Sequence, residues 1–227
     1  MSTVDRPLGL GELLAETVRL YGERLWASFG LGAVVGGSFL LTILTPVALD
    51  IVVAALAFTA CYGAAARVAA GDSFAEAFAQ TSVRLPVLLV LALVVAVPFA
   101  IALSQLYLLL LAVAWLGLAG FSIPVAMLER DPAAPSWFGR LSYALYRSVA
   151  LARSEYLHAV GVAAALVVIY ILFGIVLATA LAGFGENSEI AAVALTQVVL
   201  APFFFLGLSV LYFEQKARAI SSLRQKG

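Results

Sequence analysis

Charged residues are scarce in this chain, and their scarcity sets the class of protein. They make up 11% of the 227 residues, whereas a soluble domain carries about 25%. In their place, 64% of the residues are hydrophobic and the mean hydropathy is +1.08. The 13 basic residues balance the 13 acidic ones, so nothing indicates a nucleic-acid partner. The composition excludes an ordinary soluble domain and predicts a protein that lies in the lipid bilayer.

Residues that carry chemistry are equally few. Cys61 is the single cysteine and His158 the single histidine, which excludes an internal disulfide, a multi-histidine metal site and an HExxH protease. The sequence also lacks a GxSxG elbow, a glycine-rich phosphate loop with lysine and a CxxC pair. We interpret Cys61 as a small packing residue and His158 as an interfacial anchor. The sequence therefore predicts no catalytic residue, no metal site and no cofactor.

Long apolar runs are what the chain has instead. Six of them are predicted to be membrane-spanning helices, because each can cross a hydrocarbon core of about 30 Å at about 1.5 Å per residue. They cover residues 27–45, 50–68, 86–104, 106–128, 158–182 and 190–213. The third and fourth runs are separated only by a short polar break and are predicted to form a tight hairpin.

Three segments between these runs have the spacing of amphipathic helices. These are residues 9–25, 73–85 and 137–156. In the first, Arg19 can pair with Glu16 and Glu23, three and four residues away. In the second, Ser73 and Glu76 have the spacing of a capping box. The predicted fold is an all-α, polytopic membrane bundle of six transmembrane helices with three cytoplasmic interfacial amphipathic helices.

The predicted elements repeat with a period of roughly 65 residues within one domain, residues 1–227. Each unit is an amphipathic helix followed by a two-span hairpin, and the units begin near Leu10, Phe74 and Leu141. Triplication would produce this period, and so would the economy of building a bundle from hairpins. The sequence leaves both explanations open.

Every lysine and arginine can be placed on one side of the membrane. The inner segments hold Arg6, Arg19, Arg24, Arg67, Arg84, Arg130, Arg140, Arg147, Arg153, Lys216, Arg218, Arg224 and Lys226. The outer turns carry only acids, namely Asp50, Glu186 and Glu189. Because positive charge in short loops sets the orientation of insertion, we expect both termini in the cytoplasm and a multi-pass protein of the plasma membrane.

Polar residues inside the predicted spans are the candidates for an intramembrane site, since no charged residue lies near a span centre. The foremost are Thr59, Tyr170 and Gln197. A glutamine in lipid usually bonds a neighbouring helix, so Gln197 is interpreted as a link between helices before a contact for substrate.

Prolines and glycines in the spans predict kinks and close packing. Pro98, Pro124 and Pro202 each fall within a span and are expected to bend it. Gly32-x-x-x-Gly36 suits the close approach of two helices in lipid.

Three stretches carry a resemblance to a known family. They are Arg6-Pro7-Leu8-Gly9-Leu10-Gly11-Glu12-Leu13 with Arg19-Leu20-Tyr21, then Pro124 to Glu129 with Ala144 to Arg153, and finally Leu211 to Arg218. Together they resemble the bacterial family named after the membrane domain of glycerophosphoryl diester phosphodiesterases. The chain departs from that pattern at Val149, where tryptophan is usual, and at Glu214-Gln215-Lys216.

The resemblance implies a six-span integral membrane module that stands alone, without the hydrolytic barrel domain of the larger enzymes. The family's recurrent residues correspond to Glu129, Arg147, Arg153, Glu214 and Arg218, all at the predicted cytoplasmic interface. We interpret them as an ion-pair network that ties interfacial helices to span ends, with a lipid-headgroup site as the alternative.

Three functional hypotheses follow from these patterns. The first is a non-enzymatic integral membrane protein whose cytoplasmic face engages anionic lipid or a partner membrane protein. The second is a small transporter or permease subunit with a cavity between kinked spans, dependent on Gln197 or Tyr170. A third, a membrane-embedded phosphodiesterase, needs a metal cluster that the sequence lacks.

Overall fold

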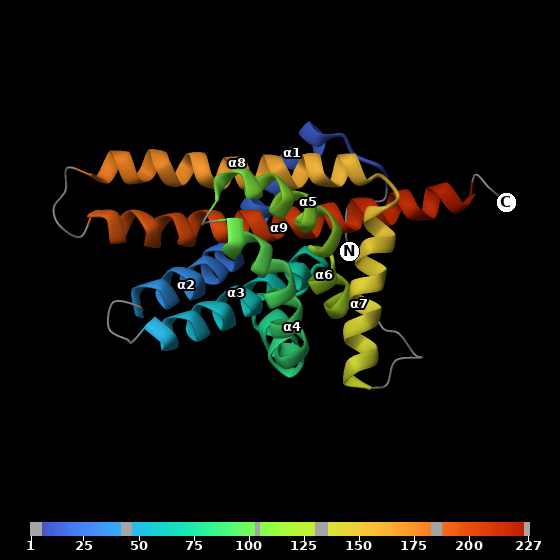
Figure 1. Cartoon of the computed structure of the whole chain (residues 1–227), viewed down its shortest axis with the longest axis horizontal. Helices are drawn as coiled ribbons and strands as arrows, with labels where there is room; N and C mark the ends of the chain where they lie inside the picture. Colours follow the sequence, from blue (N-terminus) through green and yellow to red (C-terminus); the bar gives the residue numbers. More distant parts are fainter. Residues whose placement is uncertain (1–5, 42–46, 103–104, 130–135, 183–187, 225–227) are drawn as a thin grey trace.

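Helices form every regular element in the part of the chain that the computed structural model describes, residues 6–41, 47–102, 105–129, 136–182 and 188–224 (Figure 1). The elements are α1 (Leu10–Glu23), α2 (Leu25–Leu41), α3 (Val47–Ala69), α4 (Phe74–Ala102), η1 (Leu106–Leu108), α5 (Leu109–Ala119), α6 (Ser122–Leu128), α7 (Trp137–Ala152), α8 (Tyr156–Leu181) and α9 (Ser188–Arg224). Arg130, Glu186 and Lys226 lie outside the described residues, as do the side chains of Asp50, Glu189 and Arg224.

Within the described residues, five helical segments are long and apolar enough to cross a membrane. These are Val52–Ala69, Phe74–Pro98, Leu109–Leu128, Tyr156–Leu181 and Ile190–Ser222. The first predicted span corresponds to α2, which meets α1 at a bend of 92°, and the bent pair raises the number of candidate spans to six. The all-α membrane bundle predicted from the sequence is confirmed.

The long helix α9 is the centre of the bundle and contacts α1, α2, α3 and α8. Gly32 and Gly36 of α2 face Val198 of α9, and a Cβ atom on Gly32 would lie 1.8 Å from the Val198 carbonyl oxygen. That carbonyl has lost its usual helical donor, because Pro202 has no N–H group. The close packing predicted for the two glycines is confirmed.

Two of the three predicted interfacial helices are separate elements. The first is α1, which buries Leu13 and Thr17 and leaves Arg19 paired with Glu16 and Glu23 at 2.5 Å on its outer face. The other is α7, which lies across the start of α8 and across α9 and does not run alongside them (Figure 1). α7 ends at Ala152, four residues earlier than predicted, because the chain turns there into α8.

The prediction of a separate helix at residues 73–85 was wrong. Ser73 and Glu76 form the expected capping interactions, but α4 then runs without a break through Pro86. A proline inside a helix removes one hydrogen bond and its ring clashes with the carbonyl four residues earlier, which together cost roughly 3 kcal/mol. Packing of the α4 side chains Leu88 and Leu91, both fully buried, outweighs that cost and carries the helix on along α3.

The predicted span at residues 106–128 is divided between η1, α5 and α6. The break follows Gly120, because Pro124 has no N–H to continue the helical bonding. The Gly120 carbonyl instead accepts a hydrogen bond from the hydroxyl of Tyr62 in α3, at 2.7 Å. Ser148 of α7 donates to the nearby Leu118 carbonyl at 2.6 Å. Side chains of the neighbouring helices α3 and α7 therefore supply hydrogen bonds to backbone carbonyls at the break.

A side chain from a neighbouring helix also replaces the hydrogen-bond donor that is missing at Pro98 in α4. It leaves the Val94 carbonyl without its helical donor, and the indole N–H of Trp115 in α5 donates to that oxygen at 2.9 Å. In lipid, where no water reaches such a group, a replacement donor is worth more than at a protein surface. Pro98, where the sequence predicts a kink, thus takes part in a joint between α4 and α5.

The last predicted span, residues 190–213, is only part of α9, which reaches Arg224. The residues beyond 213 continue the helix because their side chains pack back on the bundle: Glu214 and Gln215 are buried, and Glu214 pairs with Arg218 one turn later. Figure 1 shows this end of α9 extending past α7.

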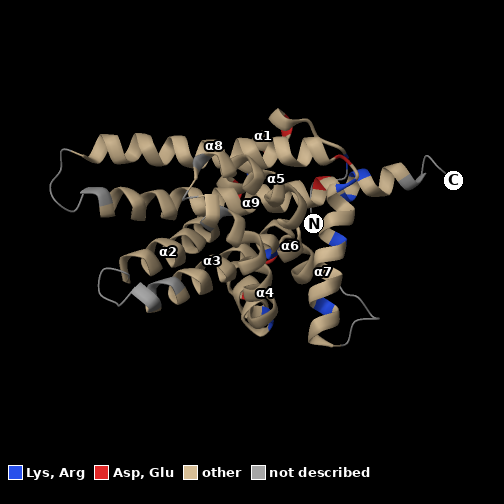
Figure 2. Ribbon diagram, viewed as in Figure 1, with Lys and Arg blue, Asp and Glu red and all other residues tan. Residues whose placement is uncertain are grey.

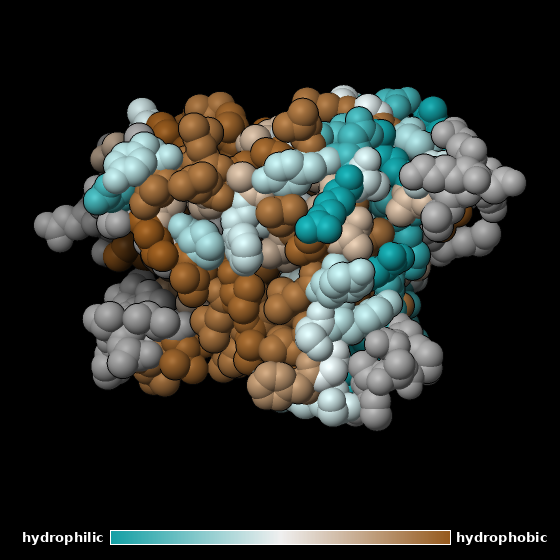
Figure 3. All heavy atoms as spheres, turned by 45° about the vertical axis from the view of Figure 1, so that its right-hand side comes forward, coloured by the Kyte–Doolittle hydropathy of each residue, from teal (hydrophilic) through white to brown (hydrophobic). Residues whose placement is uncertain are grey.

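Charged residues gather at one end of the bundle (Figure 2). We define the charged end as residues 6–9, α1, the junction of α3 and α4, Glu129 directly after α6, α7, the start of α8 and residues 212–222 of α9. Away from it, the described parts of α2 and α8 carry no blue or red ribbon in Figure 2. The space-filling view shows the same division, with hydrophilic residues on one side of a largely hydrophobic surface (Figure 3).

Candidate functional site

The carboxylate of Glu129, directly after α6, joins three helices at the charged end. Its Oε1 accepts hydrogen bonds from the Tyr212 hydroxyl at 2.8 Å and from Lys216 Nζ at 3.2 Å. Its Oε2 accepts from the Tyr143 hydroxyl and from Arg147 Nε, both at 3.1 Å. Tyr143 and Arg147 belong to α7, and Tyr212 and Lys216 to α9. We call these five residues the Glu129 cluster.

The Glu129 cluster keeps its carboxylate charged. Burial alone would disfavour the charge, but the hydrogen bond from Tyr212 and the positive charges of Lys216 and Arg147 outweigh it. The pKa of Glu129 is therefore lower than the ordinary value for glutamic acid. The cluster stays ionised at neutral pH and holds α7 across the end of α9.

A second carboxylate, Glu214, is fully buried and organises the other side of the charged end. It pairs with Arg218, accepts a hydrogen bond from the backbone N–H of Leu8 at 3.4 Å, and lies 3.7 Å from Nε2 of His158. Arg218 also pairs with Glu155 and donates to the Leu8 carbonyl at 2.8 Å. We call these five residues the Glu214 cluster. It ties the segment before α1 to the start of α8 and to α9.

The five residues indicated by the family resemblance thus have three different surroundings. Glu129 and Arg147 lie in the first cluster, and Glu214 and Arg218 in the second. Arg153 is exposed at the turn before α8, and its side chain forms no ion pair or hydrogen bond with the described residues. The two clusters connect the segment before α1, the end of α6, α7, the start of α8 and α9, whereas Arg153 lies outside both clusters.

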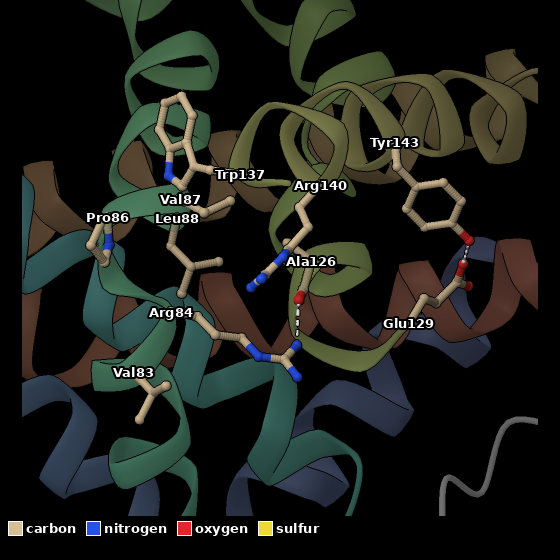
Figure 4. A pocket seen from close by; sticks show the side chains of 10 residues that line it. All are labelled: Val83, Arg84, Pro86, Val87, Leu88, Ala126, Glu129, Trp137, Arg140 and Tyr143. Atoms are coloured by element: carbon tan, nitrogen blue, oxygen red, sulfur yellow. Dashed lines mark hydrogen bonds between the residues drawn. The ribbon is translucent and has the colours of Figure 1, made fainter. Parts of the chain in front are cut away.

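A cavity of about 620 Å³ lies beside the Glu129 cluster, between α4, α6 and α7 (Figure 4). Its apolar wall is formed by Val83, Pro86, Val87, Leu88, Ala126 and Trp137. Its polar groups are Arg84, Glu129, Arg140 and Tyr143. The cavity is therefore amphipathic, with arginines next to a hydrophobic surface.

Arg84 is fixed in this cavity by the end of α6. Its Nη1 donates to the carbonyls of Ala126 at 2.5 Å and Met127 at 2.9 Å. A cation at this position is stabilised by the negative end of the helix dipole. Arg140 is exposed on the first turn of α7, and Figure 4 shows its side chain projecting into the same cavity beside Ala126.

Sequence reasoning counted Arg84 and Arg140 among the inner basic residues but did not recognise them as a site. The two arginines are 56 positions apart in the chain (140 less 84), and only the packing of α6 and α7 beside α4 brings them together. One sequence signal was present: Arg84 stands next to Val83 and directly before a long apolar run. That arrangement is typical of a cation at the edge of a membrane.

The intramembrane candidates form bonds within the bundle. The Tyr170 hydroxyl in α8 donates to Oε1 of Gln197 in α9 at 2.6 Å, so Gln197 links neighbouring helices. Thr59 donates to the Ala55 carbonyl of its own helix at 2.6 Å. Thr59 also lines a cavity of about 220 Å³ between α3 and α4, which is otherwise lined mainly by apolar side chains such as Phe58.

Within the described ranges, no group of three or more histidine, cysteine or acidic side chains is arranged to hold a metal ion. Comparison of the chain with family models, curated proteins and solved structures gave no match. The resemblance to the membrane domain of glycerophosphoryl diester phosphodiesterases stays a prediction from the sequence.

Proposed function

We propose that this integral membrane protein is not an enzyme and that its charged end engages anionic lipid at the cytoplasmic face of the plasma membrane. The observation that carries the proposal is the location of the exposed arginines. Arg153 directly follows α7, the helix that lies across the start of α8 and across α9, and Arg140 lies on the first turn of α7; both side chains are exposed. The exposed arginines thus present positive charge at the depth of lipid headgroups.

Aromatic side chains support this placement. Trp26 at the bend between α1 and α2 is 87% exposed, and Trp137, Phe138 and Tyr146 on α7 are exposed as well. Tryptophan and tyrosine prefer the membrane–water interface, where an apolar ring and a polar group are both satisfied. Exposed aromatic residues among arginines are unfavourable on a water-facing surface but suit an interfacial helix.

The transporter hypothesis has less support. It depended on Tyr170 or Gln197, and these two side chains bond each other between α8 and α9. Their mutual hydrogen bond gives both groups a structural role between α8 and α9. A partner membrane protein at the charged end is compatible with the same exposed arginines and is distinguished by the experiment below.

The experiment is gentle extraction followed by mass spectrometry of the lipids and proteins that co-purify. The proposal expects anionic phospholipid to be enriched over its share in the source membrane, and the enrichment to fall as the salt concentration rises. If the co-purifying lipids match the bulk membrane and a protein co-purifies at a fixed stoichiometry, the proposal of a lipid ligand is contradicted and a partner protein takes its place. Reporter fusions after residue 227 test the cytoplasmic orientation separately.

A further inference from the structure

We propose that the cavity of about 220 Å³ between α3 and α4 holds one acyl chain of a bilayer phospholipid, which enters sideways from the lipid. We call this space the α3–α4 cavity. The inference goes beyond the proposed function, because it concerns the apolar chain of a lipid within the spans and does not involve a headgroup at the charged end.

The α3–α4 cavity lies between two candidate spans. Its lining residues on α3 fall within 54–62, inside the segment Val52–Ala69, and those on α4 fall within 89–96, inside Phe74–Pro98. On each helix these residues extend over about two turns, which corresponds to a length of about 11 Å. Neither range contains a charged residue, so the cavity lies at the depth of the hydrocarbon core.

One side of the α3–α4 cavity is closed by the bundle and the other side is open. The buried residues of its floor are Thr59, Tyr62, Val95, Ile123 and Phe205. At its mouth, Phe58 of α3 is 37% exposed and Leu93 of α4 is 49% exposed. Because both residues belong to spans, they face lipid and not water. The mouth is therefore an opening through which an acyl chain can enter from the bilayer.

The polar side chains in the wall of the cavity are already bonded within the bundle. Among the described residues that line it, only Thr59 and Tyr62 have polar side chains. The Thr59 hydroxyl donates to the Ala55 carbonyl at 2.6 Å, and the Tyr62 hydroxyl donates to the Gly120 carbonyl at 2.7 Å. A water molecule in a cavity needs about three polar partners, so water is disfavoured here and an apolar occupant is favoured.

The size of the cavity and its aromatic wall also favour occupation. An apolar cavity of roughly 150 Å³ already binds a small hydrocarbon such as benzene, and the α3–α4 cavity is larger. Phe205 stacks on Tyr62 with the ring centroids 5.1 Å apart and meets Phe58 edge to face at 5.8 Å. Closing the cavity would disturb these ring contacts. An acyl chain supplies van der Waals contacts to the wall without breaking any hydrogen bond.

The test is native mass spectrometry of the full chain released from nanodiscs that contain only phosphatidylcholine, so that no anionic headgroup contributes. Wild type is expected to retain one phosphatidylcholine per chain. Ala92→Leu puts a larger side chain into the cavity and should weaken retention about tenfold. Ala33→Leu is the matched control, because it adds the same atoms at an exposed alanine of α2 outside the cavity. It should leave retention unchanged.

A second variant, Ala55→Leu, fills the cavity from α3 and should weaken retention in the same way. Both cavity variants should unfold in detergent at the wild-type temperature or above it, since leucine atoms fill the space. A lower unfolding temperature in both would mean that the cavity has no room for a hydrocarbon, which contradicts the inference.

Three results of the retention experiment would also overturn the inference. In the first, wild type retains no phosphatidylcholine. In the second, Ala92→Leu and Ala55→Leu retain as much as Ala33→Leu. In the third, dihexanoyl phosphatidylcholine, whose chains are too short to reach the cavity, displaces the bound lipid as well as the long-chain lipid does. The proposed function survives each of these results, because it depends on anionic headgroups, which the nanodiscs lack.

Discussion

The indole of Trp115 in α5 donates its N–H to the backbone carbonyl of Val94 in α4, across 2.9 Å. That carbonyl is the one that Pro98, four residues later, cannot bond. A proline in one helix and a tryptophan in another thus form a single structural unit. The same logic links Pro124 to Tyr62, whose hydroxyl bonds the Gly120 carbonyl at 2.7 Å.

Trp115→Phe should lower the stability of the folded protein by about 1 kcal/mol, because it leaves the Val94 carbonyl without a donor in lipid. In a Pro98→Ala background the same substitution should cost much less, since an alanine in place of the proline restores the helical N–H. Thermal unfolding in detergent measures both, and Trp26→Phe serves as the control at an exposed site. If Trp115→Phe lowers stability equally in the two backgrounds, the role of Trp115 does not depend on Pro98.

Gly32→Ala should be far more harmful than Gly37→Ala. The added Cβ would lie 1.8 Å from the Val198 carbonyl oxygen at position 32, whereas nothing lies within 4 Å of it at position 37. We expect a loss of at least about 3 kcal/mol for Gly32→Ala, or failure to fold, because backbone must move. Gly37→Ala should change stability by less than about 0.5 kcal/mol. The yield of monodisperse protein and its unfolding temperature would show the difference.

Glu129→Gln should destabilise the protein at neutral pH but not in acid. The folded-state pKa of Glu129 lies below its ordinary value of 4.5, so its charge stabilises the fold above that pH. This contribution is lost as the pH falls through the lower, folded-state pKa. The stability difference between wild type and Glu129→Gln should be about 1 to 3 kcal/mol at pH 7 and shrink below pH 4.5. A difference that is constant with pH would mean that packing, not charge, is lost.

Arg218→Gln should release the segment before α1, because Arg218 bonds both the Leu8 carbonyl and the carboxylate of Glu214. It also leaves Glu214 buried without its main cation, which costs about 3 to 5 kcal/mol. Limited proteolysis near residues 6–9 should become faster. The double variant Glu214→Gln with Arg218→Gln removes the unpaired charge and should recover stability. If the double variant is no more stable than Arg218→Gln alone, Glu214 is not the origin of the loss.

Local patterns predicted the helices well where the signal lies within one helix. The apolar runs gave α3, α8 and the candidate spans, and the spacing of Glu16, Arg19 and Glu23 gave the outer face of α1. Gly32-x-x-x-Gly36 predicted a close helix contact but not its partner, α9. These predictions succeed because hydrophobic periodicity and i, i+3 and i, i+4 pairs are properties of the sequence itself.

The errors arose where distant parts of the chain decide the structure. Pro86 indicates a helix boundary in the sequence, but the packing of α4 on α3 continues the helix through it. Glu129 is a candidate from the sequence, yet its partner Tyr212 is 83 residues away and has no local signal. Arg84 and Arg140 were missed as a pair for the same reason. Their common cavity exists only because α6 and α7 fold back beside α4.

The most direct test of the central claim, that the charged end binds anionic phospholipid, is an equilibrium titration of the purified wild-type chain. Short-chain phosphatidylglycerol and phosphatidylcholine are compared at low ionic strength in the same detergent. Exposed positive charge at the charged end predicts that phosphatidylglycerol binds at least about tenfold more tightly, and that the ratio falls towards one in high salt. Equal dissociation constants for the two lipids at low salt would contradict the account.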